Sequence, residues 1–107
     1  MNWAVSLSHD FPIIFQRVIS YELTSSETAI VSHKGNKYEI SVDSMRRIDS
    51  PKYVYGDSVS PANHPELVGV VCEMIYHFNR NEPQYFIKVD GKKKSKRYFA
   101  DELICRN

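Results

Sequence analysis

The sequence predicts an all-β protein with little or no helix. Seven Tyr and five Phe are many for 107 residues, and aromatic and β-branched side chains favour pleated, half-buried strands. Several short segments also alternate between apolar and polar residues, with turn-forming residues between them. The length fits one ordinary domain or two very small ones.

The first strands are predicted from alternation in the N-terminal half. Residues 13–23 alternate from Phe15 onward, which is typical of a half-buried strand. The residues expected on one face are Phe15, Arg17, Ile19, Tyr21 and Leu23. Residues 24–26 form a turn, and residues 28–33 form a second strand.

A third strand follows a tight connection over residues 34–36, where Gly35 and Asn36 both tolerate positive φ. Tyr38, Ile40 and Val42 form its inner face. Residues 49–52 then resemble a linker, so we expect an N-terminal β unit over residues 1–50 and a second unit over residues 51–107.

The second unit opens with residues 53–59, and Pro61 and Pro65 then mark an irregular loop because proline donates no ladder hydrogen bond. The longest apolar run, residues 67–78, is expected to be a curved central strand with a bulge or bend at Gly69. A helix over residues 66–78 is the competing interpretation, which the valines beside Gly69 disfavour.

The remaining elements close the second unit. Residues 79–83 form a hairpin turn, residues 85–90 alternate as a strand, and Asp90-Gly91 is a strong turn signal. Residues 92–96 form the basic tip of that hairpin, and residues 97–99 return. Residues 100–103 form a 3₁₀ turn, and residues 104–105 form the closing strand.

A weak internal repeat links the two halves. Residues 42–45 and 100–103 each read small, Asp, polar and large apolar, and each follows a strand that contains a tyrosine. One match of this kind leaves two architectures open. The chain forms either two tandem barrel-like units or one small barrel with an N-terminal β extension.

The second half resembles an SH3-like small barrel, particularly the KOW and Tudor types and the small barrel subunits that dock on photosynthetic complexes. The residues that carry the likeness are Gly56, Asp57, Val59, Gly69, Val70, Val71, Tyr85, Ile87, Val89 and the segment 98–103. In those families a comparable 3₁₀ element precedes the closing strand. The paired aromatics and acidic loop of peptide-binding SH3 domains are not found in order, so proline-rich ligands are not expected.

The whole chain also resembles small bacterial immunity proteins, including those of contact-dependent growth inhibition. This resemblance implies a non-catalytic protein that neutralises a toxin by stoichiometric binding. Two alternatives stay open: a nucleic-acid-binding barrel that uses its basic hairpin, and an accessory subunit of a larger complex.

Charge and cysteine content limit the function classes. The formal charge of +1 argues against a polyanion mimic or a general nucleic-acid binder. Cys72 and Cys105 are too few for a disulfide framework and lie in apolar stretches. No signal peptide or membrane span is expected, so we predict a cytoplasmic protein. Edge strands of small barrels pair readily, so a homodimer is also compatible with the sequence.

The candidate partner-binding residues are a basic run and a few aromatic residues outside the expected strands. A basic run contacts phosphates or an acidic partner, or else is a solvated turn that deters edge pairing. The flanking rings of residues 85, 86, 98 and 99 could stack bases but fit the core more simply. The predicted site residues are Lys92, Lys93, Lys94, Lys96, Arg97, Tyr53, Tyr55 and Trp3.

No catalytic, metal or cofactor site is predicted. The four histidines are scattered, and neither cysteine has a partner at zinc-ligand spacing. Cys72 and His77 fall on opposite faces of the expected strand, which excludes a nucleophile pair. No glycine-rich phosphate loop is present, since the four glycines are isolated. We therefore expect a protein that is not an enzyme.

Overall fold

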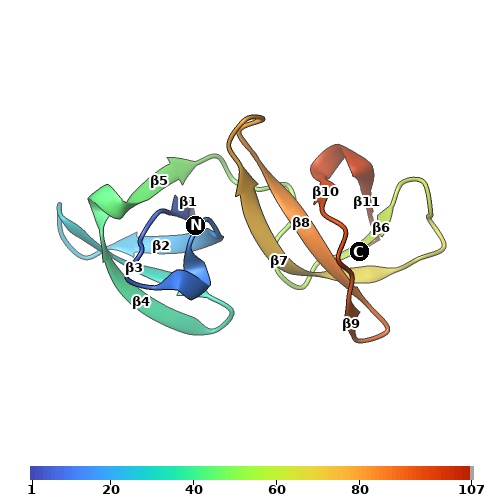
Figure 1. Ribbon diagram of the computed structural model, residues 1–107, viewed down its shortest axis with the longest axis horizontal. Coiled ribbons are helices and arrows are strands. Elements are labelled where there is room, and N and C mark those ends of the chain that lie inside the picture. Colours follow the sequence, from blue (N-terminus) through green and yellow to red (C-terminus); the bar gives the residue numbers. More distant parts are fainter. Residues whose placement is uncertain (107) are drawn as a thin grey trace. The chain divides into compact units, whose positions relative to one another are not determined.

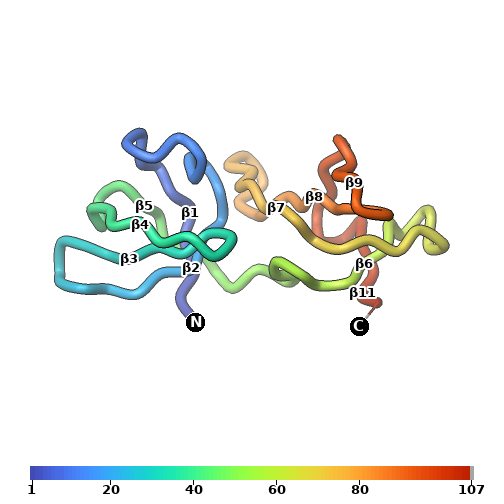
Figure 2. The backbone as a smooth tube through the Cα atoms, turned by 90° about the horizontal axis from the view of Figure 1, so that it is seen from below, coloured from blue at the N-terminus to red at the C-terminus, as the bar shows by residue number. Residues whose placement is uncertain are grey.

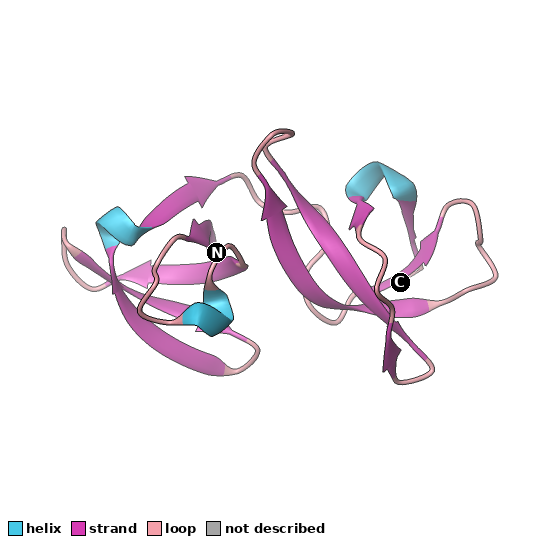
Figure 3. Ribbon diagram, viewed as in Figure 1, coloured by secondary structure: helices cyan, strands magenta, loops and turns pink. Residues whose placement is uncertain are grey.

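The computed structural model describes residues 1–106, in which strands and short 3₁₀ turns are the regular elements (Figure 3). The predicted all-β class is therefore confirmed. The chain divides into two compact units, a first unit of residues 1–50 and a second unit that begins at Pro51. None of the described residues belongs to a helix long and apolar enough to cross a membrane.

The first unit is a five-stranded antiparallel sheet in the order β4-β3-β2-β1-β5 (Figure 1). Four strands follow one another as a meander, and the fifth returns to lie beside the first. The strands are β1 (Asn2–Ser6), β2 (Val18–Leu23), β3 (Thr28–His33), β4 (Asn36–Ser41) and β5 (Met45–Ile48), with 3₁₀ turns η1 (Pro12–Ile14) and η2 (Val42–Ser44).

The second unit repeats this strand order as β10-β8-β7-β6-β11, with β9 also paired to β8 (Figures 1 and 2). Its fifth position, β11, again lies beside its first strand, β6. The elements are β6 (Ser58–Pro61), β7 (Gly69–His77), β8 (Glu82–Val89), β9 (Lys92–Lys93), β10 (Tyr98–Phe99), η3 (Ala100–Glu102) and β11 (Leu103–Cys105).

The weak sequence repeat corresponds to a repeated structural element. In each unit a 3₁₀ turn, η2 or η3, precedes the last strand. The next residue donates its backbone N–H to the first residue of that turn, from Met45 to Val42 and from Leu103 to Ala100. Met45 and Leu103 are both buried. The repeat therefore places one large apolar side chain into each core.

The hairpin before each 3₁₀ turn is also shared. Lys34 and Gly35 have φ of 50° and 82°, and Asp90 and Gly91 have φ of 52° and 77°. Two consecutive positive φ angles are the signature of a type I′ turn, which suits two-residue hairpins. The predicted Asp90-Gly91 turn is confirmed, whereas the first turn lies one residue earlier than predicted, because His33 pairs with Asn36.

The first predicted strand of the first unit begins later than predicted, because its first residues form a 3₁₀ turn. The predicted strand over residues 13–23 begins only at Val18, because Pro12 opens the 3₁₀ turn η1 and Gln16 has a φ of 61°. This turn buries Ile14 and leaves Ile13 63% exposed. Leu23, which we expected on the same face as Ile19 and Tyr21, is 49% exposed at the strand end, whereas those two residues are buried.

Two strands of the first unit, β1 and β5, were not predicted from the sequence. β1 lies between β2 and β5, and three of its five residues are buried. β5 is only four residues long and begins at Met45. A strand buried on both faces shows no alternation, and a four-residue strand is too short for a pattern to be recognised. Val42 lies in η2, so the third predicted strand ends at Ser41.

The long apolar run is a strand, β7, which excludes the competing helix. Its bulge lies between Val71 and Glu73, two residues after the predicted position at Gly69. A Cβ on Gly69 would stand 2.9 Å from the carbonyl oxygen of Lys88, so glycine permits close approach of two strands there. Pro61 is the last residue of β6 and not part of the irregular loop.

Candidate functional site

The fourth strand of the second unit is interrupted, and the basic residues lie at the interruption. In the first unit β4 runs unbroken from Asn36 to Ser41. In the second unit the equivalent stretch is split into β9 and β10 by residues 94–97. Gly35 precedes Asp43 by eight positions, whereas Gly91 precedes Asp101 by ten. We call residues 92–97 the basic segment.

Strand pairing directs one lysine of the basic segment onto an aromatic ring. Lys93 pairs with Lys88, which lies two residues after Phe86 in β8. Residues two apart in a strand share a face, and so do directly opposed residues of an antiparallel pair. Lys93 Nζ accordingly lies 4.4 Å from the centroid of the Phe86 ring.

Two further cations of the segment cover aromatic rings. The guanidinium carbon of Arg97 lies 5.7 Å from the centroid of Phe86, and Lys96 Nζ lies 5.1 Å from that of Tyr98. Each contact at an exposed site stabilises by about 0.5–1 kcal/mol. The backbone N–H of Lys94 also donates to the carbonyl oxygen of Ile87 at 2.9 Å. These contacts hold the basic segment against β8.

The charges of the basic segment are uncompensated. Within residues 1–106, none of its cations forms an ion pair with a carboxylate, and all five are exposed. Positive charge that is concentrated without counter-charges attracts an anionic partner and speeds its association. The cations are Lys92, Lys93, Lys94, Lys96 and Arg97.

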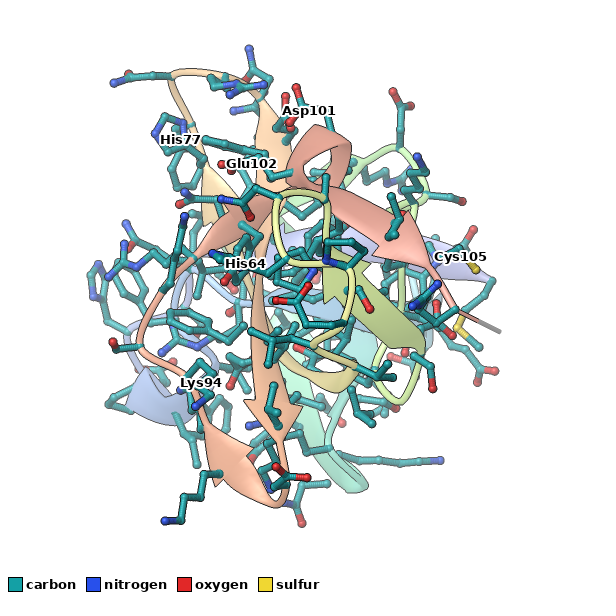
Figure 4. The ribbon with its side chains drawn as sticks, turned by 90° about the vertical axis from the view of Figure 1, so that its right-hand side faces the viewer. His64, His77, Lys94, Asp101, Glu102 and Cys105 are labelled. Atoms are coloured by element: carbon teal, nitrogen blue, oxygen red, sulfur yellow. The ribbon has the colours of Figure 1, made fainter. Side chains whose placement is uncertain are left out.

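A second cationic cluster is, by contrast, neutralised. Arg80 lies 3.7 Å above the Phe99 ring, and its guanidinium contacts Glu82 at 3.3 Å and Asp101 at 3.6 Å. The edge of His77 packs on the same ring at 5.1 Å. This cluster ties the β7–β8 hairpin to β10 and η3. Figure 4 shows His77 and Asp101 at one end of the second unit and Lys94 at the other.

The aromatic site residues separate into three different places. Tyr53 is only 3% exposed, so the prediction that it is a partner-binding anchor is wrong. Its hydroxyl donates to the carbonyl oxygen of Leu103 at 3.3 Å, and its ring meets Tyr85 edge-on at 5.5 Å. The half-buried Tyr55 donates its hydroxyl to Glu73 at 2.9 Å. Trp3 belongs to β1 of the first unit, and not to an irregular terminal segment.

Tyr85 belongs to the core of the second unit, as its place in the alternation predicts. It is fully buried, and its hydroxyl accepts the backbone N–H of Tyr53 at 3.4 Å. Burial raises the pKa of the Tyr85 phenol above its usual value of 10.0. Phe86, Tyr98 and Phe99 are half-buried, so the simpler interpretation that most of the flanking rings belong to the core holds only for Tyr85. Adjacent residues of a strand face opposite sides, so the alternation over residues 85–90 could have indicated that Phe86 lies outside the core that holds Tyr85.

One shallow pocket lies on the first unit and was not predicted. It has a volume of about 160 Å³, below the size of pockets that enclose drug-sized ligands. Hydroxyl groups and two opposite charges line it, with no buried charged side chain. The lining residues are Met1, Ser20, Tyr21, Glu22, Ile30, Ser32 and Lys37.

No cluster suited to metal binding occurs among residues 1–106, where no three His, Cys, Asp or Glu side chains come together. Cys72 is half-buried, with its thiol 3.5 Å from the carbonyl oxygen of Phe86, and Cys105 is exposed. Both cysteines lie in strands as expected, Cys72 in β7 and Cys105 in β11, but the two thiols differ in exposure. The basic segment remains the surface with the clearest chemical character.

Residues 9–104 match the model of a family of unknown function, DUF6960. The chain belongs to the DUF6960 family. Because the match covers both units, the tandem arrangement and the basic segment lie within the family region. No curated protein and no solved structure matches the chain.

Proposed function

We propose that this DUF6960 member is a non-catalytic binding protein whose basic segment holds an acidic protein surface. The observation that supports the proposal is the set of five exposed cations, none of which has a carboxylate partner within residues 1–106. Leaving such charges unpaired is unfavourable in the free chain because like charges repel. An acidic partner would relieve that repulsion.

The geometry of the aromatic rings favours a protein over a nucleic acid. Single-stranded nucleic acids stack their bases on open aromatic faces. Here Lys93 and Arg97 cover Phe86, and Lys96 covers Tyr98. A base that stacked on the ring faces these cations cover would have to displace them. The net charge of +1 is also low for a strong nucleic-acid binder.

We further propose the architecture and the partner class. The closing strand beside the first strand, after a 3₁₀ turn, supports an SH3-like barrel for each unit. The specific partner that we propose is a bacterial toxin domain, which the chain would inhibit as a stoichiometric complex in the cytoplasm. The small size and the resemblance to immunity proteins support this partner. Survival of toxin-producing cells that lack the chain would contradict it.

The test of the acidic partner uses two columns, polyglutamate and single-stranded DNA. We expect polyglutamate to retain the wild-type chain and to retain the Lys94→Gln/Lys96→Gln variant less strongly. The matched control Lys37→Gln/Lys52→Gln removes the same charge elsewhere and should elute close to wild type. Equal elution of both variants would contradict a role for the basic segment.

Binding of nucleic acid by the same segment is the second candidate. The five unpaired cations favour it as well, because they could neutralise phosphates. This candidate predicts stronger retention on single-stranded DNA than on polyglutamate, with a steep salt dependence that the Lys94→Gln/Lys96→Gln variant flattens. Stronger retention on polyglutamate would instead support the acidic protein partner.

A further inference from the structure

Ser95 is an exposed hydroxyl in the middle of the basic segment. It lies outside regular structure, between β9 and β10, with three lysines before it and Lys96 and Arg97 after it. Within residues 1–106 its side chain forms no hydrogen bond. Its backbone and hydroxyl are therefore accessible to an enzyme that must bind an irregular segment.

The surroundings of Ser95 match the charge pattern that basic-directed protein kinases select. Such kinases discriminate among substrates by the charges that flank the acceptor hydroxyl. We propose that Ser95 is a phosphorylation site for a kinase of this class, and that the modification switches off binding by the basic segment. The second half of this proposal rests on the proposed function.

The chemical step is a phosphoryl transfer from ATP. The Ser95 oxygen attacks the γ-phosphorus, and a new oxygen–phosphorus bond forms. The bond between the γ-phosphorus and the bridging oxygen breaks, and ADP leaves with that electron pair. The hydroxyl proton passes to the catalytic base of the kinase.

Phosphorylation would reverse the electrostatics of the segment locally. A phosphoserine carries about −1.5 to −2 charges at pH 7 and accepts strong hydrogen bonds from Lys and Arg. The cations that lack a carboxylate partner within residues 1–106 would then pair with the phosphate within their own segment. Less positive charge would remain for an acidic partner.

A serine in the first unit provides a matched control. Ser26 is also exposed in a turn between two strands, but acidic Glu22 and Glu27 are its charged neighbours along the chain. A kinase that selects basic segments should therefore reject Ser26. The comparison separates recognition of charge from simple exposure.

The first experiment treats the full chain with ATP and a purified kinase that selects basic segments, and then measures intact mass and maps the site. We expect one phosphoryl group on wild type and on Ser26→Ala, and none on Ser95→Ala. No incorporation into wild type, or equal incorporation into Ser95→Ala, would overturn the modification site. Folding of each variant is checked by circular dichroism.

The second experiment measures retention on polyglutamate before and after phosphorylation. We expect about tenfold weaker binding of the phosphorylated chain at low salt, and no change for kinase-treated Ser95→Ala. Equal retention of both forms would overturn the switch. If the unmodified chain does not bind polyglutamate, the proposed function is contradicted. The phosphorylation site would still be supported or overturned by the first experiment, which does not depend on binding.

Discussion

The two units of the chain have the same strand order but differ in their fourth strand and in one core position. The first unit has a continuous β4 and, five residues before its first turn residue Lys34, a fully buried Ala29 that pairs with Leu23 and Ile40. The second has the interrupted β9 and β10 and, at the equivalent position, Tyr85, which pairs with Met74 and Tyr98.

This difference shows that one small fold can carry two different surfaces. Both units keep the features that define the fold: a two-residue turn with positive φ, a 3₁₀ turn and a closing strand beside the first. The added residues lie at an exposed edge, where they leave the core undisturbed. The second unit therefore carries concentrated charge that the first unit lacks.

The largest effects should come from the cores, where the two units should respond alike. Ile19 in β2 is fully buried, and Ile87 in β8 is 1% exposed. Truncating either to alanine leaves a cavity and should lower the free energy of unfolding by about 2–5 kcal/mol. Urea denaturation measures both variants. A cost below about 1 kcal/mol for one of them would show that its unit lacks a packed core at that residue.

The paired turns should also respond alike, with smaller effects. Gly35 and Gly91 have φ of 82° and 77°, a region that is unfavourable for residues with a Cβ. We expect Gly35→Ala and Gly91→Ala each to lower the free energy of unfolding by about 1–2 kcal/mol. Urea titration of the two variants tests this, and a neutral substitution at either position would break the equivalence of the hairpins.

Ionisation of Tyr85 should lower the stability of the second unit at high pH. Its pKa is raised in the folded chain above 10.0, so the unfolded phenol ionises first. The contribution of Tyr85 to stability is therefore fully present below pH 10 and is lost as pH rises toward the folded pKa. Tyr85→Phe should flatten this alkaline loss and cost about 1 kcal/mol at neutral pH, since the Tyr53 N–H loses its acceptor. Denaturation of both proteins between neutral pH and pH 11 gives the comparison, and parallel curves would contradict the assignment.

The smallest expected effect is the coupling energy between Phe86 and Arg97, which attaches the basic segment to β8. We expect a double-mutant cycle of Phe86→Leu with Arg97→Gln to give a coupling energy of about 0.5–1 kcal/mol. The same cycle of Tyr38→Leu with Lys37→Gln in the first unit should give about zero, because no cation–ring contact links these neighbours in the described residues. Equal couplings would show that the ring does not hold the segment.

Much of the fold could be predicted because its strands have clear patterns. Residues 28–33 and the turn at Asp90-Gly91 were predicted at their observed positions. The strand β1 was not, because Ala4, Val5 and Ser6 are all buried and so show no alternation. Pro12 redirected the chain into a 3₁₀ turn that the alternation of its neighbours concealed.

The candidate site was predictable in part. The basic residues are adjacent in the sequence, so their clustering required no tertiary information. The aromatic anchors depended on burial, and Tyr53 shows why sequence was insufficient. It precedes the first strand of its unit, yet a hydrogen bond to Leu103 fifty residues later fixes it in the core. Contacts between residues so far apart leave no local pattern.

The proposed binding of an acidic protein by the basic segment is tested by a pull-down from native lysate. The baits are the tagged wild-type chain, Lys94→Gln/Lys96→Gln and Lys37→Gln/Lys52→Gln, each with and without nuclease. We predict one stoichiometric protein that survives nuclease treatment, is retained by wild type and the Lys37/Lys52 control, and is lost from the basic-segment variant. Recovery of nuclease-sensitive nucleic acid as the segment-dependent material, or equal recovery of the protein by both variants, would contradict the claim.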